Sequence, residues 1–163
     1  MLASCPRAAS SGRGEDGGRR PLNSERLLCA TDGSAVSEKA VMYTISLALK
    51  TSQAVTFLLV ADGDAEAQPM VWDEGKLKGE DLPPDKELLA ALQLALKHDL
   101  LRLRLVRAFG GDPAEAIVAY AERNGYHHII VGSAGHTGAR RLLLGSVAED
   151  VVTRAHCPVT IVR

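Results

Sequence analysis

Apolar residues are arranged in two alternating patterns along the chain. Short apolar runs, which are typical of buried strands, occur at residues 27–31, 55–61, 102–108, 128–131 and 158–162. Between most of these runs, apolar residues recur every three to four positions, as in amphipathic helices, at residues 41–49, 88–96, 117–121 and 147–152. Because strands and helices alternate, we expect an α/β fold with three layers, in which a doubly wound, five-stranded parallel sheet carries helices on both faces.

Local signals set the ends of some elements. Asp112 followed by Pro113 is a favourable helix start, since Asp caps free N–H groups and Pro has no N–H to leave unpaired. Asn124-Gly125 predicts the end of that helix in a left-handed turn. The polar stretch at residues 62–84 predicts a long loop, with Trp72 in a mobile or partly packed insertion; the alternative is a flap over a ligand.

Composition predicts one globular domain and a separate N-terminal segment. Residues 1–24 are rich in Ser, Gly, Arg and Pro, so we expect a disordered extension there and a single domain at residues 25–163. The net charge of −1 provides no general attraction to nucleic acid or to an anionic membrane. No apolar run reaches the roughly 18 residues of a membrane span. The three cysteines lack CxxC spacing, which favours a reducing, cytoplasmic setting without disulfides or zinc.

The segment after the fourth predicted strand is rich in glycine. Gly132 and Gly135 follow the strand, and Gly145-Ser146 begins the last predicted helix. Glycines let a backbone approach an anion closely, and the N–H groups and dipole of a helix start favour negative charge. In doubly wound sheets, ligands bind at the carboxyl ends of the strands, where the strand order reverses. We therefore interpret the segment as a phosphate cradle; the alternative is a tight turn followed by an ordinary helix cap.

Several spacings together resemble the universal stress protein family, in its ATP-binding form. The pieces are Gly132-x2-Gly135-x9-Gly145-Ser146, Asp32-Gly33-Ser34 after the first strand, and the segments at residues 111–115, 143–149 and 156–163. The similarity runs from about Glu25 to Arg163. It implies a Rossmann-like strand order of 3-2-1-4-5 and an adenine nucleotide, ATP with or without Mg²⁺, as the ligand.

The resemblance also assigns roles to individual residues. Asp32 would meet the ribose beside the backbone of Ala30 and Thr31, with Gly132 nearby, and Val60 would line the adenine. The phosphates would be held by Gly135, Gly145, Ser146 and Val147, and Ser133 would also belong to the nucleotide-binding residues. Ala134 and His136 occupy positions that are often polar or basic in the family. Arg140 and Arg141 either compensate by reaching inward or are solvated.

Other residues suggest little chemistry. Adjacent residues of a strand point to opposite faces, so His127 and His128 are not expected to share a metal ion. Cys29 and Cys157 are expected to be core residues. We expect no catalytic residue and at most slow ATP hydrolysis.

Three functions are compatible with the sequence. The preferred one is a nucleotide-binding regulatory protein of the stress response. The alternatives are an adenine-nucleotide α-hydrolase-like enzyme, which would need a serine- and glycine-rich loop after the first strand, and an interaction module that has lost the nucleotide. The family resemblance, together with an apolar last strand at the sheet edge, predicts a homodimer through the C-terminal strand; a monomer is the alternative.

Overall fold

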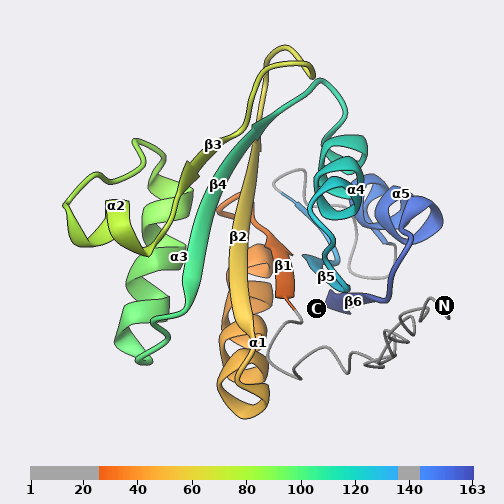
Figure 1. Ribbon diagram of the computed structural model, residues 1–163. Helices are drawn as coiled ribbons and strands as arrows, with labels where there is room; N and C mark the ends of the chain where they lie inside the picture. Colours follow the sequence, from red (N-terminus) through yellow and green to blue (C-terminus); the bar gives the residue numbers. More distant parts are fainter. Residues whose placement is uncertain (1–25, 136–143) are drawn as a thin grey trace, which may run out of the picture.

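The computed structural model describes residues 26–135 and 144–163, which form one α/β unit (Figure 1). The predicted disordered extension at residues 1–24 lies outside the described residues. The same holds for the expectations on His136, Arg140 and Arg141. No helix in the described part of the chain combines the length and hydrophobicity needed to cross a membrane.

Five parallel strands form most of the sheet. They are β1 (Arg26–Ala30), β2 (Ala54–Ala61), β4 (Leu103–Phe109), β5 (His128–Gly132) and β6 (Val159–Val162). Their spatial order is β4-β2-β1-β5-β6, which confirms the predicted order 3-2-1-4-5. Cys29 in the central strand β1 lies beside Phe57 of β2 and Ile130 of β5. The order reverses at β1, so the crossovers after β1 and β5 leave in opposite directions and open a space at the carboxyl ends of the strands.

The sheet has a sixth strand, and the prediction of a long loop at residues 62–84 was wrong. β3 (Met70–Trp72) pairs antiparallel with the edge strand β4, and α2 (Glu74–Lys78) follows it. The indole of Trp72 is buried in the core at 4% exposure and is not part of a mobile insertion. Lys76 Nζ donates to the Val71 carbonyl at 2.9 Å. Three residues are too few for a two-residue periodicity to be visible, so only the tertiary pairing reveals this strand.

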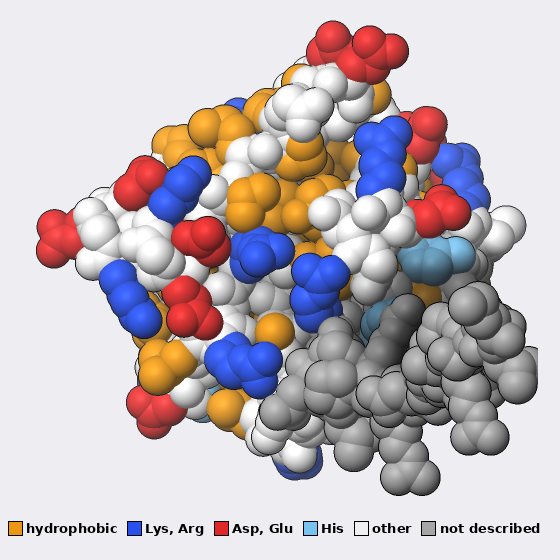
Figure 2. All heavy atoms as spheres, in the orientation of Figure 1, with side chains coloured by type: hydrophobic (Ala, Val, Ile, Leu, Met, Phe, Trp, Pro, Cys, Tyr) orange, Lys and Arg blue, Asp and Glu red, His pale blue; other side chains and the backbone are white. Residues whose placement is uncertain are grey.

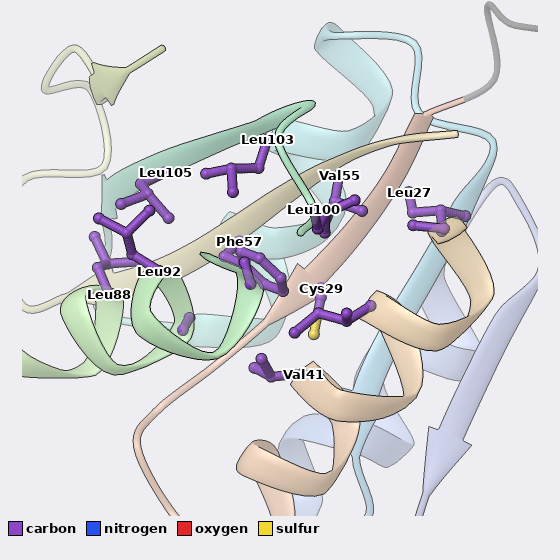
Figure 3. Packing of buried hydrophobic residues seen from close by; sticks show 14 of the residues in the cluster. Leu27, Cys29, Val41, Val55, Phe57, Leu88, Leu92, Leu100, Leu103 and Leu105 are labelled. Atoms are coloured by element: carbon purple, nitrogen blue, oxygen red, sulfur yellow. The ribbon is translucent and has the colours of Figure 1, made fainter. Parts of the chain in front are cut away.

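Helices cover both faces of the sheet. α1 (Ala35–Thr51) and α3 (Lys86–Lys97) pack on one face, and α4 (Pro113–Arg123) and α5 (Ser146–Arg154) on the other. Figure 3 shows the first face, where Leu88 and Leu92 of α3 lie against Leu105 of β4. The second face is filled by residues such as Leu58, Ile117 and Tyr126. The three predicted layers are thus present, with one apolar cluster on each face of the sheet.

The predicted start and end of α4 are confirmed. Asp112 Oδ1 accepts hydrogen bonds from the N–H groups of Ala114 at 3.0 Å and Glu115 at 3.3 Å, and Pro113 is the first helical residue. Gly125 has a φ of +64°, a left-handed conformation that residues with a Cβ rarely adopt. These local rules place the first turn of α4 directly after the carboxyl end of β4.

Charged side chains are mixed on the face shown in Figure 2. Lys and Arg side chains are separated by neutral and apolar ones, and Asp and Glu side chains lie among them. No merged basic surface is seen on the described part of this face.

Candidate functional site

A cavity of about 320 Å³ opens at the carboxyl ends of the central strands. The first turns of α4 and α5 complete its walls. Nine of the ten predicted site residues line it: Ala30, Thr31, Asp32, Val60, Gly132, Gly135, Gly145, Ser146 and Val147. The tertiary structure therefore brings together residues from four segments of the chain at one place.

Ser133 is the predicted residue that does not line the cavity. Its N–H donates to the Val162 carbonyl at 2.7 Å, and its own carbonyl accepts from the Gly145 N–H at 2.8 Å. These bonds tie the carboxyl end of β5 to β6 and to the residue before α5. Ser133 thus fixes the two ends of the glycine-rich segment relative to each other.

One wall of the cavity is apolar. Leu58 and Val60 are two residues apart on β2 and point to the same side, and Pro113 and Ile117 are one turn apart on α4. Leu58 and Ile117 are almost completely buried, whereas Val60 is half-buried. Two apolar surfaces from a strand and a helix suit a flat aromatic group such as a purine.

The predictions missed part of this wall and several neighbouring residues. The additional lining residues are Ser37, Leu58, Pro113, Ile117, Val131, Ala134 and Ala148. The two-residue period of a strand could have added Leu58 once Val60 was chosen. No signal in the sequence indicates which turn of α4 reaches the cavity, because that depends on how the helix crosses the sheet.

Asp32 lies at the junction between the two walls. Its Oδ1 accepts from the Ser34 N–H at 2.9 Å, which closes the turn after β1. A Cβ on Gly135 would lie only 2.7 Å from Asp32 Oδ2, far inside a normal contact. Glycine at position 135 is therefore needed for the close approach of the glycine-rich segment to this carboxylate.

The opposite wall is built from backbone. A Cβ on Gly132 would come within 3.1 Å of the Ser37 nitrogen and the Val36 carbonyl carbon in the first turn of α1. α5 begins at Ser146, and no described side chain caps its first turn. The first N–H groups of a helix have no partner within the helix, and its dipole favours negative charge there. This end of the cavity is suited to a phosphate or another anion.

A small buried polar network supports the turn after β1. Thr31 Oγ1 lies 3.3 Å from Ser37 Oγ, which donates to the Ser34 carbonyl at 2.9 Å. Ser34 Oγ in turn accepts from the Ser37 N–H and caps α1. The Thr31 N–H donates to the Leu58 carbonyl at 2.9 Å. Because these groups bond to one another, β1, β2 and α1 are held in one arrangement below the cavity.

Cys29, Cys157 and the pair His127-His128 lie outside the cavity. Burial raises the pKa of the Cys29 thiol to about 12, so this side chain is a neutral core residue. Burial also raises the pKa of Cys157 and lowers that of His128. His128 Nε2 lies 2.8 Å from Thr160 Oγ1, while its neighbour His127 is exposed. Within residues 26–135 and 144–163, no three His, Cys, Asp or Glu side chains are grouped to hold a metal ion.

A second hollow, of about 520 Å³, lies on the other flank of α4. It runs between residues 65–71 and α4, and its lining includes Phe109, Asp112, Ala119 and Tyr120. None of the predicted site residues lines it. α4 therefore separates the two hollows, with Pro113 and Ile117 facing the smaller one.

Comparison with known proteins decides the family. The model of the universal stress protein family matches residues 23–163. The chain belongs to this family. It is 31% identical to universal stress protein MJ0531 of Methanocaldococcus jannaschii over 150 residues, which are 85% of this chain and 82% of that protein.

Solved structures agree with the fold. A universal stress protein from Archaeoglobus fulgidus, in complex with dAMP, superimposes with a TM-score of 0.61 at 19% identity, covering 88% of this chain and all of that one (100%). Another universal stress protein, in complex with cAMP, gives a TM-score of 0.62 at 21% identity over 85% of this chain and 96% of the other. At these identities the likeness establishes the three-layer α/β architecture.

Proposed function

We propose that this universal stress protein is a regulatory protein of the stress response that binds an adenine nucleotide, ATP in particular, in the cavity at the carboxyl ends of β1, β2 and β5. One observation carries the proposal. One cavity is lined by an apolar wall from β2 and α4, by glycine backbone and by a helix start that no described side chain caps, and Asp32 follows β1, which lies between β2 and β5. The base, sugar and phosphates of a nucleotide require these three environments in this order.

Each part of the cavity has a role in this proposal. Leu58, Val60 and Ile117 contact the adenine. The Asp32 carboxylate accepts hydrogen bonds from ribose hydroxyls, which are stronger than those to a neutral acceptor. The phosphates lie at the first turn of α5, near Gly145 and Ser146, where a Mg²⁺ ion bound to ATP would enter with its nucleotide.

The relatives support an adenine nucleotide as the ligand class. The two structural neighbours with dAMP and with cAMP have the same architecture. Both ligands contain adenine and one phosphate, so base and phosphate are the parts that a shared site would recognise. ATP is chosen because the spacing of Gly132, Gly135, Gly145 and Ser146 resembles that of the ATP-binding form of the family.

We extend the proposal to assembly and location. β6 is an edge strand that pairs with β5, and its four residues are half-buried. An apolar edge strand with Val159, Ile161 and Val162 favours pairing with the same strand of a second copy. The proposed form is a cytoplasmic homodimer.

ATP binding and turnover measured together test the function. We expect submillimolar ATP affinity in calorimetry and negligible ADP release. In Gly135→Ala the new Cβ displaces Asp32 Oδ2, so the affinity should fall about tenfold or more, the effect of losing a hydrogen bond to a charged group. Gly111→Ala is the matched control, because a Cβ there meets nothing within 4 Å and lies outside the cavity.

Three results would contradict the proposal. Turnover faster than about one per second, ordinary for enzymes, would favour the α-hydrolase-like alternative. Absence of ATP binding by the folded wild type would favour the interaction module. Equal loss of affinity in Gly135→Ala and Gly111→Ala would show that the nucleotide does not bind in this cavity.

A further inference from the structure

Both helices on the second face of the sheet contribute residues from their first two turns to the cavity. Pro113 and Ile117 come from α4, and Ser146 and Val147 come from α5. The two helices also pack against each other through buried residues such as Ala121, Ala148 and Val151. The distance between the apolar wall and the anion-binding wall therefore depends on how α5 crosses α4.

An ion pair joins the last turn of α5 to the start of α4. Arg154 Nη1 donates to Asp112 Oδ2 at 2.9 Å, and Arg154 Nη2 lies 3.6 Å from Asp150 Oδ2 one turn earlier on α5. Asp112 uses its two oxygens differently, since Oδ1 caps the first turn of α4 and Oδ2 accepts from Arg154. The carboxylate that caps one helix is thus held by the other helix.

The charges of the pair favour this arrangement. The hydrogen bond from Arg154, followed by the bond from the Glu115 N–H, lowers the pKa of Asp112 below its ordinary range. The same contact raises the pKa of Arg154. Both groups are therefore charged at neutral pH, and the contact is a charge-assisted hydrogen bond.

We propose that Arg154 is a positioning residue for the nucleotide: by holding Asp112 it fixes the first turn of α4 relative to α5 and so sets the width of the cavity. The inference rests on the proposed function. Arg154 does not line the cavity itself, and its effect passes through Asp112 to Pro113, the next residue, which does. A nucleotide that contacts both walls binds more tightly when the walls are held at the right separation.

The expected effect is small but measurable. The Arg154 and Asp112 side chains are 43% and 41% exposed, so solvent screens the pair. Exposed ion pairs have modest effects, equivalent to a change of up to about fivefold in an equilibrium constant. Buried contacts of Ala148 and Val151 hold α5 on the sheet when the pair is absent. We expect Arg154→Ala to bind ATP about twofold to fivefold more weakly than the wild type.

Two further variants separate positioning from helix capping. Asp112→Asn retains an oxygen that can cap α4 but loses the charge that binds Arg154, so it should weaken ATP binding as much as Arg154→Ala does. The double variant should be no weaker than either single one, because both changes remove the same interaction. Arg154→Lys retains a charge and should bind ATP more tightly than Arg154→Ala.

Asp150→Asn is the matched control. It removes the other ion pair of Arg154, which lies within α5 and does not reach α4. Its ATP affinity should equal that of the wild type. The difference between Arg154→Ala and the wild type should also shrink in about 1 M salt, where the Debye length is about 3 Å.

The test is a calorimetric titration of each purified full-length variant with ATP. Thermal unfolding of the same variants is measured in parallel. Wild-type affinity in Arg154→Ala, even with a lowered melting temperature, would overturn the positioning role and leave the proposed function intact. An equal loss in Asp150→Asn, or additive losses in the double variant, would also overturn it. Absence of ATP binding by the wild type would overturn the proposed function and this inference together.

Discussion

The two walls of the cavity differ in how their residues are spread along the chain. The wall proposed to bind the phosphates comes mostly from one stretch, in which Gly132 ends β5, Gly135 follows it, and Gly145 directly precedes α5, which begins at Ser146. The apolar wall combines β2 with α4, which are more than 50 residues apart in the sequence. The first wall is backbone that must approach closely, and the second is side chains that are also part of the core. Substitutions in the two walls should therefore have different consequences.

The largest expected effect is a loss of protein stability when the apolar wall is substituted. Ile117 is 3% exposed and belongs to the core of the second face. Ile117→Ala should lower the free energy of unfolding by about 2–5 kcal/mol, because it removes buried methyl groups and leaves a cavity. Urea denaturation followed by circular dichroism measures the change. A loss below about 1 kcal/mol would mean that this wall is not part of the core.

The second-largest expected effect is a loss of ligand affinity when Asp32, between the two walls, is substituted. Asp32→Asn retains an oxygen that can accept from the Ser34 N–H but removes the negative charge. Affinity for both ATP and adenosine should fall about tenfold, because ribose hydroxyls lose a charged acceptor. Calorimetry with both ligands checks this. If only ATP were affected, Asp32 would act on the phosphates rather than on the sugar.

The anion-binding wall should distinguish ligands by their phosphates. Ser146 is exposed at the first turn of α5. Ser146→Ala should weaken ATP binding about threefold, the effect of one neutral hydrogen bond, and leave adenosine binding unchanged. Parallel titrations with the two ligands measure the ratio. Equal weakening of both would place the phosphates elsewhere.

The smallest expected effect is a pH dependence of protein stability that comes from the ion pair between Asp112 and Arg154. The pKa of Asp112 is lowered from 3.8 in the folded protein, chiefly by Arg154. Its contribution to stability is therefore complete above pH 3.8 and is lost as the pH falls through the lower folded value. The stability difference between the wild type and Asp112→Asn should be constant between about pH 5 and 7 and should shrink in acid. Urea unfolding at several pH values tests this, and a difference that grew in acid would contradict the assigned direction.

The difference between the walls also explains which site residues could be predicted. Gly132, Gly135, Gly145 and Ser146 form a spacing that is visible in one stretch of sequence, and the structure places all four at the cavity. Val60 was the only residue of the β2–α4 wall to be predicted. Pro113 was recognised as a helix start, and Ile117 as a member of an apolar stripe, but neither pattern says what the residue faces.

The same limit applies to the fold. The apolar runs predict the five parallel strands and the family resemblance predicts their order, whereas the sequence predicts a loop in place of β3 and α2. β3 is stabilised by pairing with β4 and by the burial of Trp72, which are contacts between distant parts of the chain. A three-residue strand has no periodicity of its own, so its existence depends on a neighbour that must already be in place.

Features whose causes lie within a few residues of one another could be predicted from the sequence. These are the alternation of strands and helices, the cap at Asp112, the left-handed turn at Gly125 and the glycine spacing before α5. Which side chains meet depends on tertiary packing, which brings Leu58 and Ile117 into one apolar wall, Asp32 against Gly135, and Arg154 onto Asp112. The physical reason is that capping and backbone conformation are local interactions, whereas the packing of helices on a sheet depends on how all the apolar surfaces are buried together.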